Sequence, residues 1–104
     1  MIDLLSASER FGDFQLRAWS GTAVDEGVGL IAIVEISDAA GRLLARFEEF
    51  LDATVHRSDP TWPRDDTAAA RRLLEKAMDK ARSEIAGDSL STLNGHRFEV
   101  TRPD

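Results

Sequence analysis

One segment constrains the fold more than any other: an amphipathic stretch that begins at Asp65-Asp66-Thr67 and continues to Ala86. Its apolar residues recur at three- and four-residue steps, the repeat of a helix with one buried face. They are Ala70, Leu73, Leu74, Ala77, Met78, Ala81 and Ile85. The two aspartates and the threonine can cap exposed amides at its start, and Gly87 is typical of a helix end. A chain with this single long helix must bury its apolar face against other elements.

The segments before the helix have the patterns of strands. Residues 13–20 alternate apolar and polar side chains, and residues 28–37, after a turn over 21–27, are rich in β-branched residues. Residues 38–41 (DAAG) fit a tight hairpin turn. Residues 42–51 then fit either a strand or an amphipathic helix, and the preceding hairpin turn favours the strand.

The remaining segments are shorter or more polar. Residues 52–64 contain prolines and predict a polar linker. Asn94-Gly95 is a strong turn signal, which predicts a short strand over 90–93 joined to a strand over 96–101. We expect residues 1–10 and 102–104 to fray.

These elements predict one α+β domain over residues 1–104: an antiparallel four-stranded sheet in the order β-β-β-α-β, with one main helix packed on one face. The last strand could join either edge of the sheet. A length of 104 residues leaves no room for a second independent core. With no cysteine, the chain has no disulfide and no cysteine-ligated metal.

Charge and hydropathy limit the classes of function. The formal net charge is -6, which disfavours nucleic acid as a partner because such binding needs a basic surface. The longest strongly apolar stretch, residues 28–34, is too short to span a membrane. We therefore expect a cytoplasmic protein with no membrane association.

A single helix is too narrow to cover a four-stranded sheet, so one face of the sheet is expected to stay open. That face would carry Trp19, Ile31, Ile33 and Leu44. Monomers seldom expose such a patch, which predicts a homodimer packed through it. Trp62, between two prolines, is a further candidate contact residue, although a tryptophan in a connecting loop more often caps the end of a small core.

Two other functions remain open as alternatives. Arg71, Arg72, Lys76 and Lys80 form a basic face of the helix that could bind nucleic acid. Alternatively, His56 and Asp59 could centre a small metal-dependent hydrolase.

Other chemical motifs have simpler structural interpretations. Residues 27–32 (GVGLIA) match a dinucleotide-binding glycine pattern, but they follow a polar turn and enter a strand instead of a helix. Ser58 and His56 lie two residues apart in a loop, which does not predict a catalytic triad. His96 is interpreted as a surface histidine. Residues 48, 49 and 52 (Glu, Glu and Asp) are interpreted as a solvated acidic edge.

The order of elements over residues 13–86 loosely resembles small bacterial folds in which three strands precede a helix, such as the partial RNase-H-like fold of HicB-type antitoxins. Small size and acidity are also similar to those of the dimeric chaperones of type III secretion. No functional residue is carried over from either family.

The sequence therefore favours a non-enzymatic protein-interaction or regulatory module that acts as a homodimer, with a further protein partner left open. No catalytic residue, metal ligand or cofactor is expected.

Overall fold

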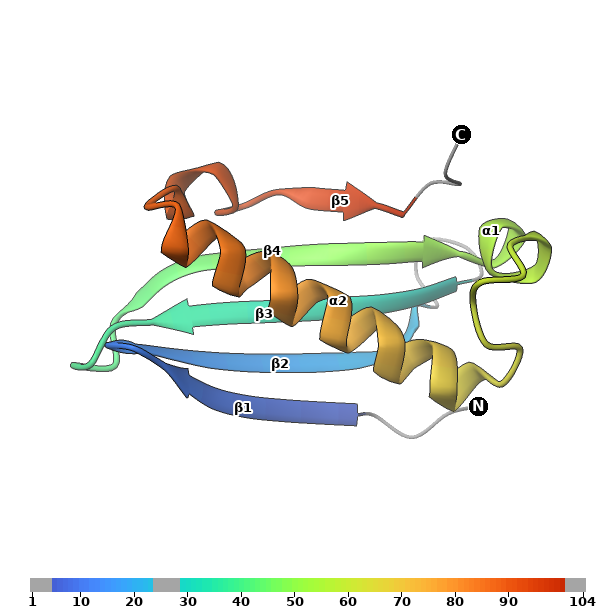
Figure 1. Cartoon of the computed structure of the whole chain (residues 1–104), viewed down its shortest axis with the longest axis horizontal. Coiled ribbons are helices and arrows are strands. Elements are labelled where there is room, and N and C mark those ends of the chain that lie inside the picture. The colour runs from blue at the N-terminus through green and yellow to red at the C-terminus, as the bar shows by residue number, and fades with distance from the viewer. Residues whose placement is uncertain (1–4, 24–28, 101–104) are drawn as a thin grey trace.

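The computed structural model describes residues 5–23 and 29–100. Five strands form one sheet in the order β1-β2-β3-β4-β5 (Figure 1). The strands are β1 (Leu5–Phe11), β2 (Phe14–Ala23), β3 (Gly29–Ser37), β4 (Leu43–Asp52) and β5 (Arg97–Glu99). The helices are α1 (Ala53–Ser58), α2 (Asp66–Ala86) and the 3-10 turn η1 (Leu90–Thr92). The structure confirms the α+β class with one main helix.

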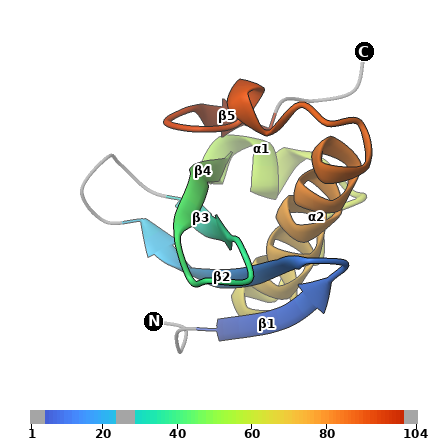
Figure 2. The same cartoon turned by 90° about the vertical axis from the view of Figure 1, so that its left-hand side faces the viewer.

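The long helix α2 crosses one face of the sheet diagonally (Figure 1). It packs against β1, β2, β3 and β4. Seen along the strands, α2 lies on one side of the sheet, and no other described helix covers the opposite side (Figure 2). The short helix α1 contacts β3 and β4 at the end of the sheet where β4 stops.

The core lies between α2 and the sheet. Alternate residues of β2, β3 and β4 point toward the helix, as the two-residue period of a strand requires. Those below 2% exposure include Leu16, Val34, Ile36, Phe47 and Leu51. The buried face of α2 matches the predicted stripe except that it also includes Ala69 and that Ile85 is only partly buried. It consists of Ala69, Ala70, Leu73, Leu74, Ala77, Met78 and Ala81.

Capping defines both ends of α2. The Asp65 side chain accepts a hydrogen bond from the Ala68 amide at 2.9 Å, which satisfies one of the free amides of the first turn. Gly87 ends the helix as predicted, but with a φ of -87°. The left-handed conformation falls instead on Asp88, whose φ is 56°.

The hairpin between β3 and β4 is confirmed. Gly41 has a φ of 85°, which favours glycine, and its amide donates to the Asp38 carbonyl at 3.0 Å. The Asp38 carboxylate also accepts from the amides of Ala40 and Arg42. Because this turn reverses the chain, β4 pairs with β3 as a strand, and the helical alternative for residues 42–51 is wrong.

The predicted four-stranded antiparallel sheet is confirmed only in part: β1 to β4 pair antiparallel, but the sheet has a fifth strand, β5, which is parallel. Residues 5–10, expected to fray, belong to β1, which pairs with β2 along its whole length. Residues 90–93, expected to be a strand, contain η1. The last strand, β5, joins the β4 edge and runs parallel to β4, because α2 carries the chain back toward the start of β4.

Two smaller differences concern loops. The polar linker over 52–64 contains α1, with Asp52 as its N-cap. Residues 21–23 of the predicted turn extend β2, and the rest of that turn lies outside the described residues. The predicted fraying of residues 1–4 and 102–104 also falls outside them.

Candidate interaction interface

The face of the sheet opposite α2, here called the helix-free face, carries four large apolar side chains. Trp19 is paired in register with Ile33, and Ile31 is paired with Phe50, so the four form a block on three adjacent strands. Trp19, Ile31 and Ile33 are partly exposed, although each is large and apolar. The structure therefore brings together three of the predicted interface residues.

Phe50 is the covered member of this block. Its side chain is only 6% exposed, and the Arg97 guanidinium lies 4.5 Å from the centroid of its ring. Gly29, the first residue of β3, lies close enough that a Cβ there would approach the ring to 2.9 Å. The Arg97–Phe50 contact joins the short strand β5 to the apolar block.

Charged side chains lie beside the apolar block toward the β3–β4 hairpin. Arg46 Nε is 3.8 Å from Glu35 Oε2, and Arg46 Nη1 is 3.4 Å from Glu48 Oε2. The Arg17 guanidinium lies 5.4 Å from the centroid of the Trp19 indole. The surface thus has an apolar centre and a polar margin, the arrangement found in protein–protein interfaces.

The fourth predicted contact residue, Trp62, lies elsewhere. It is 6% exposed and belongs to the core cluster with the buried residues of α2. The Arg72 guanidinium lies 4.8 Å from its ring centroid, and Arg72 Nη1 donates to the Thr61 carbonyl. Trp62 caps the core and is not part of the helix-free face. Leu44 is 40% exposed near the start of β4, close to the hairpin.

The predicted basic face of α2 is largely engaged in contacts within the molecule. Lys76 Nζ lies 3.4 Å from Glu49 Oε2, and Lys80 Nζ lies 4.0 Å from Glu49 Oε1. Arg72 stacks on Trp62, which leaves Arg71 as the member of the predicted set with no ion pair or ring contact among the described residues. Part of the charge of this face is therefore neutralised by Glu49.

The interpretation of residues 48, 49 and 52 as a solvated acidic edge is wrong for Glu49, which is buried. Its exposed fraction is 1%, because the alternation of β4 points it toward α2 while Glu48 points to the helix-free face. The pattern of the strand does place residue 49 inward with Phe47 and Leu51. That signal was available in the sequence.

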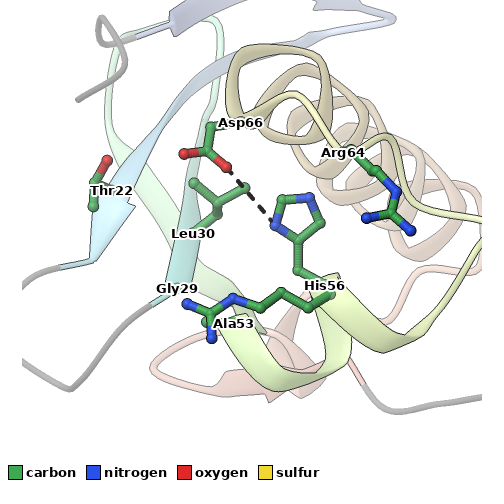
Figure 3. A pocket seen from close by; sticks show the side chains of 8 residues that line it. Thr22, Gly29, Leu30, Ala53, His56, Arg64 and Asp66 are labelled. Carbon is green, nitrogen blue, oxygen red and sulfur yellow. Dashed lines mark ion pairs between the residues drawn. The ribbon is translucent and has the colours of Figure 1, made fainter.

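His56 lies at a pocket of about 320 Å³ between α1, the start of α2, the end of β2 and the start of β3 (Figure 3). Its Nε2 lies 2.6 Å from the Pro63 carbonyl oxygen, and its Nδ1 lies 4.0 Å from Asp66 Oδ1. The predicted partner Asp59 does not line this pocket. It is buried at the end of α1 and accepts hydrogen bonds from the Thr61 amide and hydroxyl.

The other candidate sites are not assembled either. Ser58 Oγ donates to the Thr54 carbonyl at 2.6 Å, whereas His56 Nε2 contacts the Pro63 carbonyl. Residues 29–32 of the glycine pattern open β3, so no helix follows them. His96 is exposed, with its ring 6.0 Å from that of Phe98. Among residues 5–23 and 29–100, no group of three or more His, Cys, Asp or Glu side chains could hold a metal ion.

Comparisons with protein-family models, with curated proteins and with solved structures found no significant match. Within the described part of the chain, no helix combines the length and the apolar character needed to cross a membrane.

Proposed function

We propose that this protein is a non-enzymatic interaction module of the cytoplasm that forms a homodimer through the helix-free face. The observation that carries the proposal is the block of Trp19, Ile31, Ile33 and Phe50, which lies on three adjacent strands opposite α2. Burying partly exposed apolar surface of this kind stabilises an interface by about 25 cal/mol per Å² before the costs of association. A cysteine-free chain suits a reducing compartment.

The size of the face suits a second copy of the chain. Strands β2, β3 and β4 have nine or ten residues. Strands β1 and β5 are shorter, with seven and three residues. At about 3.3 Å per residue and about 4.8 Å between strands, the sheet gives a surface on the order of 600 Å². A standard interface buries about 800 Å² on each partner. Most of the face would therefore be covered in a dimer.

The charges of the face also suit self-association. The alternation of the strands places arginines and carboxylates on it in equal numbers: Arg10, Arg17, Arg46, Arg97, Glu35, Glu48, Asp52 and Glu99. The whole chain has a net charge of -6, so the remaining surface is the more acidic part. Two copies can therefore meet through this face without bringing two negative surfaces together.

The test is the oligomeric state. Sedimentation velocity of the wild type at micromolar concentration is expected to show a dimer. Ile31→Glu and Ile33→Glu each bury a charge at the centre of the interface and are expected to give monomers. Leu43→Glu is the matched control: Leu43 is 55% exposed at the hairpin end of β4, and the same charge change there should leave the dimer intact.

Far-UV circular dichroism and thermal melting separate dissociation from unfolding. Both isoleucine variants are expected to keep the helical signal of α2. A wild type that sediments as a monomer would overturn the proposal, and so would folded variants that remain dimeric.

A further inference from the structure

The pocket beside His56 has a composition unlike that of the rest of this acidic molecule. Its lining includes three basic side chains, His56, Arg57 and Arg64, and one acidic side chain, Asp66. The hollow beside Trp62 is different, because it is lined by the carboxylates of Asp59, Glu75 and Asp79 together with Arg72 and Lys76.

The two arginines of the pocket are exposed. Neither Arg57 nor Arg64 forms an ion pair or a side-chain hydrogen bond with any residue in the described ranges. By contrast, Arg42, Arg46 and Arg82 each pair with a carboxylate. Guanidinium groups match phosphate and carboxylate oxygens in geometry and charge, so two of them at one concave site favour an anion.

His56 is held in a defined orientation at this pocket. The Pro63 carbonyl can only accept, so the contact of 2.6 Å means that His56 Nε2 carries the proton and donates. The ring therefore turns Nδ1 toward Asp66 at the start of α2 (Figure 3). At 4.0 Å, Nδ1 is too far from Asp66 Oδ1 for a hydrogen bond, which leaves it able to contact a ligand oxygen.

The apolar part of the lining indicates more than a bare ion. Leu30 and Ala53 line the pocket together with Thr22 and Gly29. A volume of about 320 Å³ is at the lower end of the range for small-molecule sites. An anion with a small organic substituent would use both the guanidinium groups and these apolar side chains.

We propose that this pocket binds a small phosphomonoester, whose phosphate contacts Arg57 and Arg64 and whose organic part lies against Leu30 and Ala53. His56 Nδ1 accepts a hydrogen bond from a protonated phosphate oxygen, because Nε2 carries the ring proton. Asp66 opposes the charge of the ligand and sets an upper limit on affinity. The site lies outside the apolar block of the helix-free face, so the test of phosphate binding does not depend on whether the protein forms a dimer.

The experiment is an NMR titration of the ¹⁵N-labelled protein with n-propyl phosphate, whose alkyl group is apolar, with sodium chloride at matched ionic strength as the reference. Amides of residues 29–30, 53–57 and 64–66 are expected to shift with phosphate ester and not with chloride. Inorganic phosphate is expected to bind more weakly than the ester, because it lacks the apolar part.

Three charge variants test the assignment. Arg57→Gln and Arg64→Gln should each weaken binding by about tenfold, the effect of losing one charged hydrogen bond. Asp66→Asn should strengthen it, because a negative charge is removed from the pocket. Arg71→Gln is the matched control: Arg71 is exposed on α2 outside this pocket and should leave binding unchanged.

Several results would overturn the proposal. These are an absence of shifts at the pocket, an equal loss of affinity in Arg71→Gln, weaker binding in Asp66→Asn, or binding of inorganic phosphate as tight as that of the ester. All four substituted residues are exposed, so the variants are expected to fold, and a thermal melt checks this.

Discussion

Glu49 of β4 and Lys76 of α2 form an ion pair across the layer between sheet and helix, with 3.4 Å between Glu49 Oε2 and Lys76 Nζ. Only 1% of the Glu49 side chain is exposed, whereas Lys76 is 47% exposed. Lys80 Nζ lies 4.0 Å from the other carboxylate oxygen, which accepts no hydrogen bond from residues 5–23 or 29–100. The carboxylate is thus buried, and its two cations reach it from the surface.

This arrangement predicts that removing the two lysines alone lowers the stability of the fold much more than removing them together with Glu49. Lys76→Met with Lys80→Met leaves a buried carboxylate without a cation and should destabilise the fold by about 3 kcal/mol. Adding Glu49→Met should restore most of that loss, because no charge then remains in the layer. Urea unfolding of the wild type, the double variant and the triple variant measures both effects.

Lys80 also lies 4.1 Å from the ring centroid of Phe98, so the triple variant does not recover the wild-type stability completely. A double variant as stable as the wild type would show that Glu49 does not depend on these lysines.

A second ion pair joins the edge strand β1 to α2. Arg82 Nη2 and Nε lie 2.7 Å and 2.9 Å from the two carboxylate oxygens of Glu9. The hydrogen bonds from Arg82 lower the pKa of Glu9 below its ordinary value of 4.5, since they favour the charged carboxylate. A carboxyl group with a lowered pKa in the folded state adds stability above the ordinary pKa, and this stability is lost as pH falls through the lowered value.

Glu9→Gln should therefore lower the melting temperature at neutral pH, and the difference from wild type should shrink as the pH falls below 4.5. Thermal melts followed by circular dichroism across this range provide the measurement. Asp13→Asn, an exposed carboxylate in the turn between β1 and β2, is the control and should show no such difference. If the melting temperature of Glu9→Gln lay below that of wild type by the same amount at every pH, the lowered pKa of Glu9 would not contribute to stability.

Gly29 predicts a steric limit at the start of β3. A Cβ at this position would lie 2.5 Å from the Leu51 carbonyl oxygen and 2.9 Å from the Phe50 ring. The backbone contact cannot be relieved by a rotamer change, so Gly29→Ala should destabilise the protein by about 1–3 kcal/mol. Urea unfolding measures the loss.

Gly87→Ala is the control for Gly29→Ala. Gly87 has a φ of -87°, and a Cβ there would meet its nearest neighbours at 3.4 Å. The stability of the Gly87→Ala variant should therefore stay close to that of wild type. Equal stability of the two alanine variants would show that β3 and β4 can separate enough at Gly29 to accept the methyl group.

The local elements with a strong periodic or turn signal were predictable from the sequence. The three- and four-residue spacing of α2 identifies its buried face, since a helix has one face whatever it packs against. The Asp38–Gly41 turn likewise identifies a hairpin because its backbone requires a positive φ at Gly41. The block of Trp19, Ile31 and Ile33 on one face follows from the two-residue period of β2 and β3.

Elements with weak local signals depended on the tertiary structure. In β1, the side chains toward α2 are Leu5, Ala7, Glu9 and Phe11, so the charged Glu9 interrupts the apolar alternation. The strand is stabilised by pairing with β2 and by the ion pair of Glu9 with Arg82. The Asn94-Gly95 signal was real, but its partner is β4: the Gly95 amide donates to the Arg46 carbonyl, and Asn94 Oδ1 accepts from the Arg46 amide. The turn therefore guides β5 beside β4 instead of closing a hairpin.

The sequence by itself determined the α+β class, the buried stripe of α2 and the apolar residues of the helix-free face, because each depends on a period within one segment. Only the tertiary structure decided the parallel edge strand, the position of Trp62 in the core, the cations around Glu49 and the residues that meet at the His56 pocket. Each of these joins segments far apart in the chain. Such contacts depend on the path of the chain between the elements, which no local pattern specifies.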